Sequence, residues 1–423
     1  MKKHVLTLLM LSVVGLSLIL SASARSQDLK KEGRYYVANI DKKFNVDSGG
    51  NLILEKVVGD VVVTTWDQKV VHIAETIKMD VYTEAEAKAV LNDLDTKYRQ
   101  SGNSVIVGSA GSHRSYMQSN FQIKVPRNFN VDVGTSGGDV SVSELKGNVK
   151  IATSGGDIKV VQVDGKLDAK TSGGDISVHK TSQNVVVKTS GGDIELIDIL
   201  GEVDAKTSGG DIEITNNKAR VSAKTSGGTI KLSNIRAEVD AYTSGGDIIV
   251  NSSKGRLNVS TSGGDIKLYD IYDTVDARTS GGDVIAKNVN NGIRAKTSGG
   301  DIDLKNVNGF IEAATAGGDV VAEMTLTDFS KDHHVSMKSS GGDVKLFIPE
   351  KLPATIDATI KLSGFSWRNY DIYSDFPLKI EKDDKERDRR TGNILRASGD
   401  INGGGDLIQL STSNGNIEIK KLK

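Results

Sequence analysis

The sequence predicts an all-β protein: an elongated, single-stranded right-handed β-helix with coils of eighteen residues. Three observations support this prediction, namely a motif with a fixed period, apolar residues that alternate within each repeat, and glycine pairs that interrupt any helical run. A fixed short period indicates one structural unit stacked on copies of itself. The motif is Thr-Ser-Gly-Gly, usually followed by Asp and then Ile or Val, and it begins at Thr135, Thr153, Thr171, Thr189, Thr207, Thr225, Thr243, Thr261, Thr279 and Thr297.

The unit at residues 153–170 shows how strands arise within each repeat. Two short alternating runs separated by turn residues indicate strands with one buried face. A helix is excluded because each Gly pair would cost it about 1 kcal/mol per Gly. Neighbouring coils should pair about 4.8 Å apart, with Ile158 stacked on Ile176 and Ala205 on Ala223. The apolar residues of the unit are Ile158, Val160, Val163, Leu167 and Ala169.

Glycine pairs are predicted to form the corners of the coil. Gly adopts positive φ without a Cβ clash, so a pair of glycines permits a tight turn. A second corner is expected at Gly165 and its counterparts in other repeats. The corner glycines of three successive repeats are Gly155, Gly156, Gly173, Gly174, Gly191 and Gly192.

Residues 25–133 are expected to form N-terminal β coils with one inserted helix at 83–100. Thr83 and Glu86 match a capping box, and apolar residues follow at helical spacing. In this region we align Gly49-Gly50 with the corner glycines of the repeat, which places Gly59 on the glycine in the middle of the repeat. The repeats would thus start before their consensus becomes obvious.

Regular repeats are assigned to residues 134–323, and residues 324–423 are assigned to an insertion and a C-terminal cap with final strands. The corner at Ser339 follows Thr315 by twenty-four residues, so six extra residues interrupt the period of eighteen. Aromatic residues then gather in the cap, where Phe365 and Trp367 are expected in its core.

Residues 1–24 have the pattern of a signal peptide. Two lysines precede an apolar run from Val5 to Leu20, and Ala22-Ser23-Ala24 is a suitable cleavage site. The run is slightly short for a membrane span, although a retained anchor is the alternative. We therefore expect export to the periplasm, the outer-membrane surface or the medium, with no transmembrane segment after the signal.

The composition limits which classes of binding partner are expected. With 54 basic and 55 acidic residues, the chain has almost no net charge, so nucleic acid is not expected as a partner. The sequence has no Cys, so an exported chain must rely on packing and backbone pairing instead of disulfides. We expect a monomer whose partner is an envelope protein, a surface protein or a glycan.

Several stretches resemble a known family. GGNLILEKVVGDVVVTTW, NFQIKVPRNFNVDVGTSGGDV, the run of TSGGDI corners and the closing TSNGNIEIKK are similar to the bacterial toastrack, or adhesin-type, domain of unknown function. The resemblance covers about residues 34 to 423. It implies a right-handed β-helix-like extracytoplasmic domain with a role in adhesion or envelope-stress sensing. Relatives that sense stress often carry membrane helices or signalling domains, which are not found after the signal here.

A ladder of acidic residues is the first candidate for chemistry. It includes Asp157, Asp175 and Asp193, and repeated carboxylates beside Gly-rich corners could bind calcium. The competing interpretation is hydrogen bonding to backbone amides at the turns. Two exposed carboxylates about 5 Å apart repel by only ~0.8 kcal/mol in water, so no cation is needed. Thr229 also stands where one carboxylate should be, and we predict no metal or cofactor.

Two other candidates lie outside the acid ladder. His333 and His334 are adjacent in the insertion, where they could bind a metal or simply be exposed. Tyr242, Tyr269 and Tyr272 could stack on carbohydrate within the array. The repeated Thr side chains are expected to face inward, which argues against a flat ice-binding surface.

We predict a non-enzymatic cell-envelope repeat protein with an adhesin-like binding or scaffold role. The first alternative is an envelope-stress accessory that recognises a membrane or peptide partner. The second is a polysaccharide-active enzyme, but such sites need carboxylates on long loops, and the array has almost none.

Overall fold

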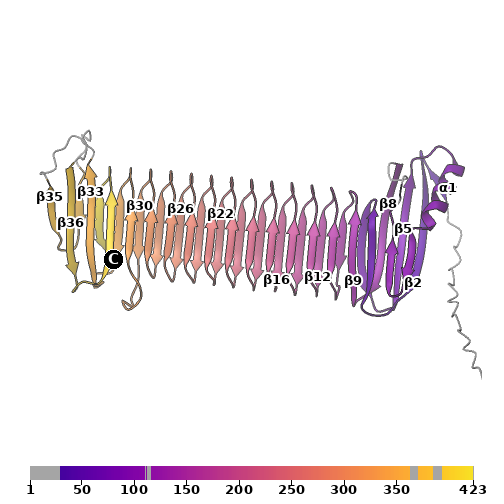
Figure 1. Ribbon diagram of the computed structural model, residues 1–423, viewed down its shortest axis with the longest axis horizontal. Coiled ribbons are helices and arrows are strands. Elements are labelled where there is room, and N and C mark those ends of the chain that lie inside the picture. The colour runs from indigo at the N-terminus through magenta and orange to yellow at the C-terminus, as the bar shows by residue number, and fades with distance from the viewer. Residues whose placement is uncertain (1–28, 110, 112–115, 363–369, 384–392, 423) are drawn as a thin grey trace, which may run out of the picture.

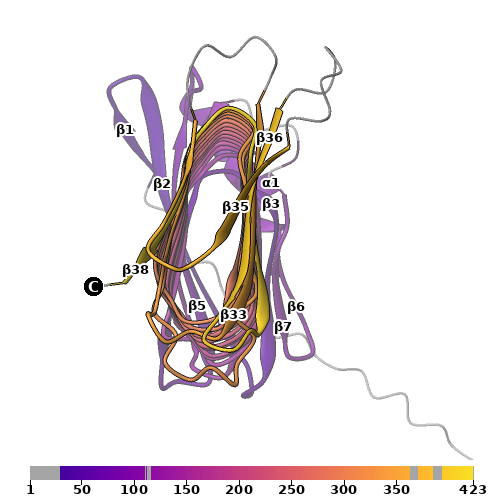
Figure 2. The same ribbon diagram turned by 90° about the vertical axis from the view of Figure 1, so that its left-hand side faces the viewer.

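The computed structural model describes residues 29–422 apart from 110, 112–115, 363–369 and 384–392. The predicted signal peptide lies outside these residues, as do Phe365 and Trp367. The described chain forms a long rod with strands stacked side by side along its length (Figure 1). Seen from its end, the rod is a flattened ring of two facing sheets with caps at both ends (Figure 2). The chain is therefore a β-helix-like solenoid, as the sequence predicts.

Each coil of the array contributes one strand to each sheet, and successive strands pair in parallel. Ile158 pairs with Ile176 in the first sheet and Leu167 with Val185 in the second, so like positions lie above one another. The first sheet contains β10 (Val140–Ser143), β12 (Ile158–Val163), β14 (Ile176–Thr181), β16 (Ile194–Ile199), β18 (Ile212–Asn217), β20 (Ile230–Ile235), β22 (Ile248–Ser253), β24 (Ile266–Ile271), β26 (Val284–Val289), β28 (Ile302–Val307), β30 (Val320–Met324) and β32 (Val344–Ile348). The second contains β9 (Phe129–Thr135), β11 (Val149–Ala152), β13 (Leu167–Lys170), β15 (Val185–Lys188), β17 (Val203–Lys206), β19 (Val221–Lys224), β21 (Val239–Tyr242), β23 (Leu257–Ser260), β25 (Val275–Arg278), β27 (Ile293–Lys296), β29 (Ile311–Ala314) and β31 (Val335–Lys338).

Stacked apolar side chains fill the space between the two sheets. Ile158, Val160 and Leu167 are buried, and their counterparts in later coils form continuous ladders. The motif threonines also face inward, as predicted. Thr171 is 7% exposed, and its hydroxyl donates to the carbonyl of Gly156 in the preceding coil at 2.9 Å. A buried hydroxyl thus has its partner and helps to join successive coils.

The corner glycines are required for a different reason from the one predicted. None of the six corner glycines of the three successive repeats has positive φ, so that part of the prediction is wrong for them: Gly155, Gly156, Gly173, Gly174, Gly191 and Gly192. Instead, a Cβ on Gly156 would lie 2.1 Å from the carbonyl oxygen of Gly138. The chain turns the corner so close to the coil below that a side chain has no room.

Positive φ falls instead on a residue that is not glycine. Gln162 has φ 57° and is left out of the pairing, because Val161 pairs with His179 and the next pair is Val163 with Thr181. This extra residue is a β-bulge, and it changes the alternation so that Val163 points into the core. The same position in other coils is left-handed at Lys180, Asp198, Asn216, Asn234, Ser252, Asp270, Asn288 and Asn306.

An antiparallel sheet and one helix cap the N-terminal end. Strand β2 (Tyr35–Asn45) pairs with β5 (Val70–Met79) and β1 (Lys30–Glu32), and β5 pairs with β8 (Met117–Pro126). Helix α1 (Glu84–Asp95) packs on this sheet. Among the described residues, no helix is long and apolar enough to cross a membrane.

Helix α1 starts as predicted and ends early. The capping box between Thr83 and Glu86 is present. The helix stops at Asp95, five residues before Gln100, because Tyr98–Ser101 forms β6, which pairs with β7 (Ser104–Val107). Tyr98, which lies within the predicted helix 83–100, therefore belongs to a strand.

One coil precedes the consensus repeats, but its predicted register is wrong. Strands β3 (Gly50–Val57) and β4 (Asp60–Trp66) stack on β9 and β10, with Val61 paired to Val140. Gly59 therefore lies next to Gly138 at the corner, not in the middle of a repeat. Of the other described strands before β9, β7 pairs in parallel with β3 and β8 pairs in parallel with β4, whereas the pairings of β1, β2 and β5 with one another and of β6 with β7 are antiparallel.

The C-terminal cap has an unexpected strand order. Strands β37 (Asp406–Thr412) and β38 (Ile417–Lys421) stack directly on β31 and β32. The cap strands, which come earlier in the sequence, lie beyond them. The last strands of the chain are thus inserted between the array and its cap. The cap strands are β33 (Ala354–Leu362), β34 (Ile372–Ser374), β35 (Lys379–Asp383) and β36 (Asn393–Ile401).

Candidate functional site

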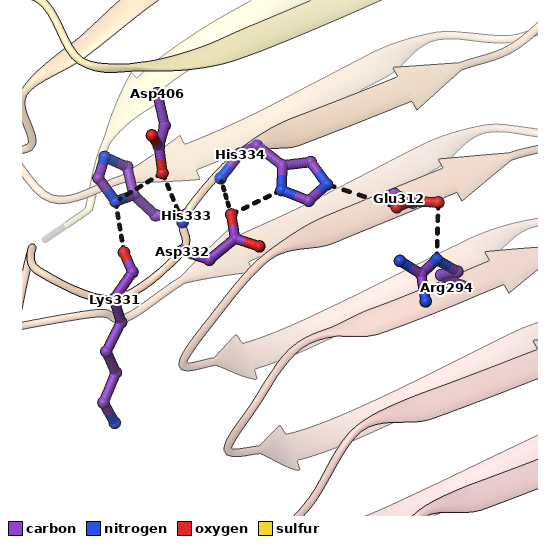
Figure 3. Close-up of polar contacts among 7 residues, drawn as sticks. All are labelled: Arg294, Glu312, Lys331, Asp332, His333, His334 and Asp406. Atoms are coloured by element: carbon purple, nitrogen blue, oxygen red, sulfur yellow. Dashed lines mark hydrogen bonds and ion pairs between the residues drawn. The ribbon is translucent and has the colours of Figure 1, made fainter.

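The histidine pair lies in the insertion, where the repeat motif is interrupted. The insertion joins β30 to β31 and brings Asp332, His333 and His334 to the side of the array (Figure 3). His334 Nδ1 lies 2.6 Å from Asp332 Oδ1, and its Nε2 lies 3.4 Å from Glu312 Oε1. Arg294, one coil earlier, donates from Nε to Glu312 Oε2 at 3.0 Å. Acidic and basic side chains thus alternate in a row of four: Asp332, His334, Glu312 and Arg294.

An aromatic ring holds the His334 imidazole in place. The Phe310 ring stacks on it with centroids 5.2 Å apart and parallel planes. Arg294 lies over the same phenyl ring at 5.0 Å, a cation–π contact. Gly292 leaves the space for this ring, since a Cβ there would lie 2.4 Å from Phe310 Cδ1.

The surroundings of His334 shift its protonation. Burial lowers the pKa of the imidazole, but hydrogen bonds and charge from Asp332 and Glu312 outweigh burial and raise the pKa above 6.5. Burial raises the pKa of Glu312. Hydrogen bonds and charge from Arg294 and His334 outweigh burial, so the pKa of Glu312 lies below 4.5. Both groups are therefore mainly charged between about pH 4.5 and 6.5, where the His334–Glu312 ion pair forms.

We expect His334→Asn to lower stability more at pH 6 than at pH 8.5. A raised folded-state pKa contributes stability below the unfolded value of 6.5, and this contribution is lost as the pH rises through the folded value. Because a third of the side chain is exposed, the difference should be about 0.5 kcal/mol. Urea denaturation of both proteins at the two pH values measures it. A loss of the same size at both pH values would contradict the assignment.

His333 is buried and connects the insertion to the C-terminal cap. It is 4% exposed, with Nδ1 2.8 Å from the carbonyl oxygen of Lys331 and Nε2 3.0 Å from that of Pro353. Its backbone N–H donates to Asp406 Oδ2 at 2.9 Å, and Nδ1 lies 3.3 Å from the same oxygen (Figure 3). His333 thus fixes the insertion against β37.

These contacts favour a structural clamp over a metal or catalytic site. Both nitrogens of each imidazole already face oxygen acceptors, and no hydroxyl of the described residues is hydrogen-bonded to either ring. Over the described ranges of the chain, no group of three or more His, Cys, Asp or Glu is arranged to hold a metal ion. The expectation that the two histidines are simply exposed is wrong for His333, which is buried. The repeat pattern does not indicate Glu312, Arg294 or Phe310 as neighbours of His334.

The acid ladder joins neighbouring coils. Asp175 N–H donates to Asp157 Oδ1 at 2.8 Å, and Asp193 N–H donates to Asp175 Oδ1 at 2.7 Å. These carboxylates accept hydrogen bonds from backbone amides, as the competing interpretation predicts. Each amide, however, belongs to the next coil and not to the same turn. Thr229 fits the ladder because its own amide donates to Asp211 Oδ1.

The surface tyrosines are scattered, and depressions in the surface lie elsewhere. Tyr242 and Tyr272 are 44% and 52% exposed. A depression of about 680 Å³ covers the start of the second-sheet strands near Asn130 and Asn148. Another, of about 400 Å³, lies along the turns that follow the first-sheet strands and ends at Leu200. Nothing in the repeat motif indicates either depression.

Comparison with known proteins identifies the fold. A profile of the family described as Toastrack DUF4097 matches residues 60–256 and 237–420. One similar solved structure is a putative adhesin from Bacteroides fragilis, with 15% identity over 65% of this chain and 96% of that chain, and a TM-score of 0.23. Another is a putative cell adhesion protein from Clostridium sporogenes, with 8% identity over 91% of this chain and 100% of that chain, and a TM-score of 0.14. No curated protein matches the chain.

Proposed function

The chain belongs to the Toastrack DUF4097 family, and from this premise we propose that it is a non-enzymatic binding or scaffold protein of the bacterial cell envelope. One observation supports the proposal above the others: the repeats form an uninterrupted rod with a long, regular outer surface. Solenoids of this kind commonly use their extended surface for binding.

The repeated polar residues support the same proposal. Threonine hydroxyls and aspartate carboxylates of the motif are used in hydrogen bonds between coils. The histidine pair is used to attach the insertion. The motif thus specifies the coil, and a binding role would depend on the residues that vary from coil to coil.

For an adhesin-like protein, we expect the rod to be accessible on intact cells. A membrane-impermeant amine reagent should label its exposed lysines without permeabilisation, because surface binding requires exposure to the medium. Labelling of intact and permeabilised cells, with a cytoplasmic protein as the control, measures this. Labelling only after the outer membrane is permeabilised would favour the envelope-stress accessory role. Turnover of any glycan in a substrate panel would instead support the alternative that the protein is a polysaccharide-active enzyme.

A further inference from the structure

Three consecutive coils carry a concentration of cations along one edge of the rod. After β18, β20 and β22 the chain reads Lys-Ala-Arg, Arg-Ala-Glu and Lys-Gly-Arg, at residues 218–220, 236–238 and 254–256. We call these nine residues the basic edge. They contain five cations and one acid, whereas the flanking coils have Leu-Gly-Glu at 200–202 and Tyr-Asp-Thr at 272–274.

The fold holds the first cation of each triplet in line. Asn217, Ile235 and Ser253 pair in register, so Lys218, Arg236 and Lys254 follow one another from coil to coil. The backbone amides of Arg236 and Lys254 donate to the preceding coil at 3.0 and 2.9 Å. The spacing along the row is therefore that of paired strands, about 4.8 Å.

Most of these cations lack an acidic partner. Arg220 binds Asp240 at 2.6 Å and approaches Glu238 at 3.9 Å. In the described part of the chain, no carboxylate lies within ion-pair distance of the four others, which are all exposed: Lys218, Arg236, Lys254 and Arg256. By contrast, cations on the outer strand faces are often paired, as Lys206 is with Asp204.

Stacking like charges in register is unfavourable for the free protein. Two cations about 5 Å apart repel by ~0.8 kcal/mol in water, and the row contains two such neighbouring pairs. An anion bound along the row would relieve this repulsion. Sequence choices that oppose local stability are expected mainly at functional sites.

We propose that the basic edge binds a linear acidic polysaccharide, with one carboxylate near each coil. The small residues Ala219, Ala237 and Gly255 separate the row of three cations from a mixed second row of Arg220, Glu238 and Arg256, which leaves room for a narrow chain over the first row. Exposed Asn216 and Asn234 lie beside the first row. Asn216 Nδ2 donates to Asp198 Oδ1 at 2.9 Å and Asn234 Nδ2 donates to Asn216 Oδ1 at 2.7 Å, so each amide keeps one N–H for a sugar hydroxyl. Tyr272, at the end of the row, offers an exposed ring on which a sugar can stack.

The surroundings favour a narrow chain over a membrane. Acidic residues flank the basic edge on both sides, with Asp198 and Glu202 before it and Asp270 and Asp273 after it. A flat anionic membrane would face these acids together with the cations, and the repulsion of the acids would offset part of the attraction. A polymer can contact the three coils alone.

Nucleic acid fits less well than polysaccharide. Charges along one strand of DNA are about 3.4 Å apart, closer than the cations of the row. Single-stranded nucleic acid also prefers a series of aromatic platforms, and the row ends in one tyrosine. An acidic polysaccharide therefore matches the edge best, which deepens the binding role proposed above and depends on it.

The test is equilibrium binding of the full chain to polygalacturonate at low salt. Methyl-esterified polygalacturonate is the matched ligand, because it keeps the sugars and removes the charges. The variant is Lys218→Glu with Arg236→Glu and Lys254→Glu. Its control is Lys159→Glu with Lys224→Glu and Lys287→Glu, which makes the same change in net charge at exposed positions elsewhere.

We expect the unmodified chain to bind polygalacturonate but not the esterified polymer, with an affinity that falls between about 50 and 200 mM salt. The edge variant should lose at least about tenfold in affinity, whereas the control variant should stay within about threefold. Absent binding, or equal binding by the two variants, overturns the proposal. Edge-dependent binding only to anionic lipid vesicles or oligo-dT also overturns it. These results are distinguishable from failure of the envelope role, which the cell-labelling experiment tests separately.

Discussion

Alanine at Gly228 is expected to destabilise the protein far more than alanine at the adjacent Gly227. A Cβ on Gly228 would lie 2.0 Å from the carbonyl oxygen of Gly210, whereas one on Gly227 would lie 3.2 Å from that of Gly209. The first clash involves backbone on both sides, so it can be relieved only by separating two coils. We expect a loss of about 3 kcal/mol for Gly228→Ala, at the upper end of the usual overpacking cost.

Gly227→Ala is the matched control, since it adds the same methyl group to the same corner. We expect it to cost about 1 kcal/mol or less, because a shift of a few tenths of an ångström relieves its contact. Urea denaturation and melting temperatures compare the two variants. Equal losses would show that neighbouring coils separate easily at the corner.

Removing one member of the buried Glu75–Lys97 pair is expected to have an effect of similar size. Lys97 Nζ lies 2.7 Å from Glu75, and the two side chains are 5% and 0% exposed. Burial lowers the pKa of Lys97 despite the nearby carboxylate, and Tyr98 donates to the other carboxylate oxygen. Glu75→Gln would leave the ammonium buried without a counter-charge, so we expect a loss of about 3–5 kcal/mol.

The double variant Glu75→Gln with Lys97→Met distinguishes pairing from packing. It removes both charges, so its cost should be well below the sum of the two single variants. Denaturation of all four proteins completes a double-mutant cycle. Additive losses would mean that the two charges do not depend on each other.

The array could be predicted from the sequence because its information is local and repeated. A period of eighteen residues indicates which residues stack, as Ile158 does on Ile176. The left-handed bulge was missed, although Asn at positions such as Asn216 and Asn234 was an available signal, since Asn tolerates positive φ. The close approach of Gly156 to Gly138 is a contact between coils, and such a contact cannot be predicted from a single repeat.

The caps and the clamp could be predicted only in part. Pairings such as β2 with β5 are antiparallel and follow no period, so they could not be predicted from the sequence. In the N-terminal cap, only the capping box of α1 could be. Near the insertion, Arg294 and Glu312 are one coil apart and follow from the repeat. His334 reaches them because six extra residues change the path of the chain, and the repeat does not specify that path.

The strand order at the C-terminal end constrains how the protein can be made. During synthesis the N-terminal part of a chain emerges first, so coils can be added to the array one after another. The cap strand β34, however, pairs with β38, which is made after it. Until β37 and β38 arrive, the edges of β31 and β32 stay open and the cap has no surface on which to dock. Open strand edges promote association between chains, so a newly made molecule is protected from aggregation only after its last strands have been inserted.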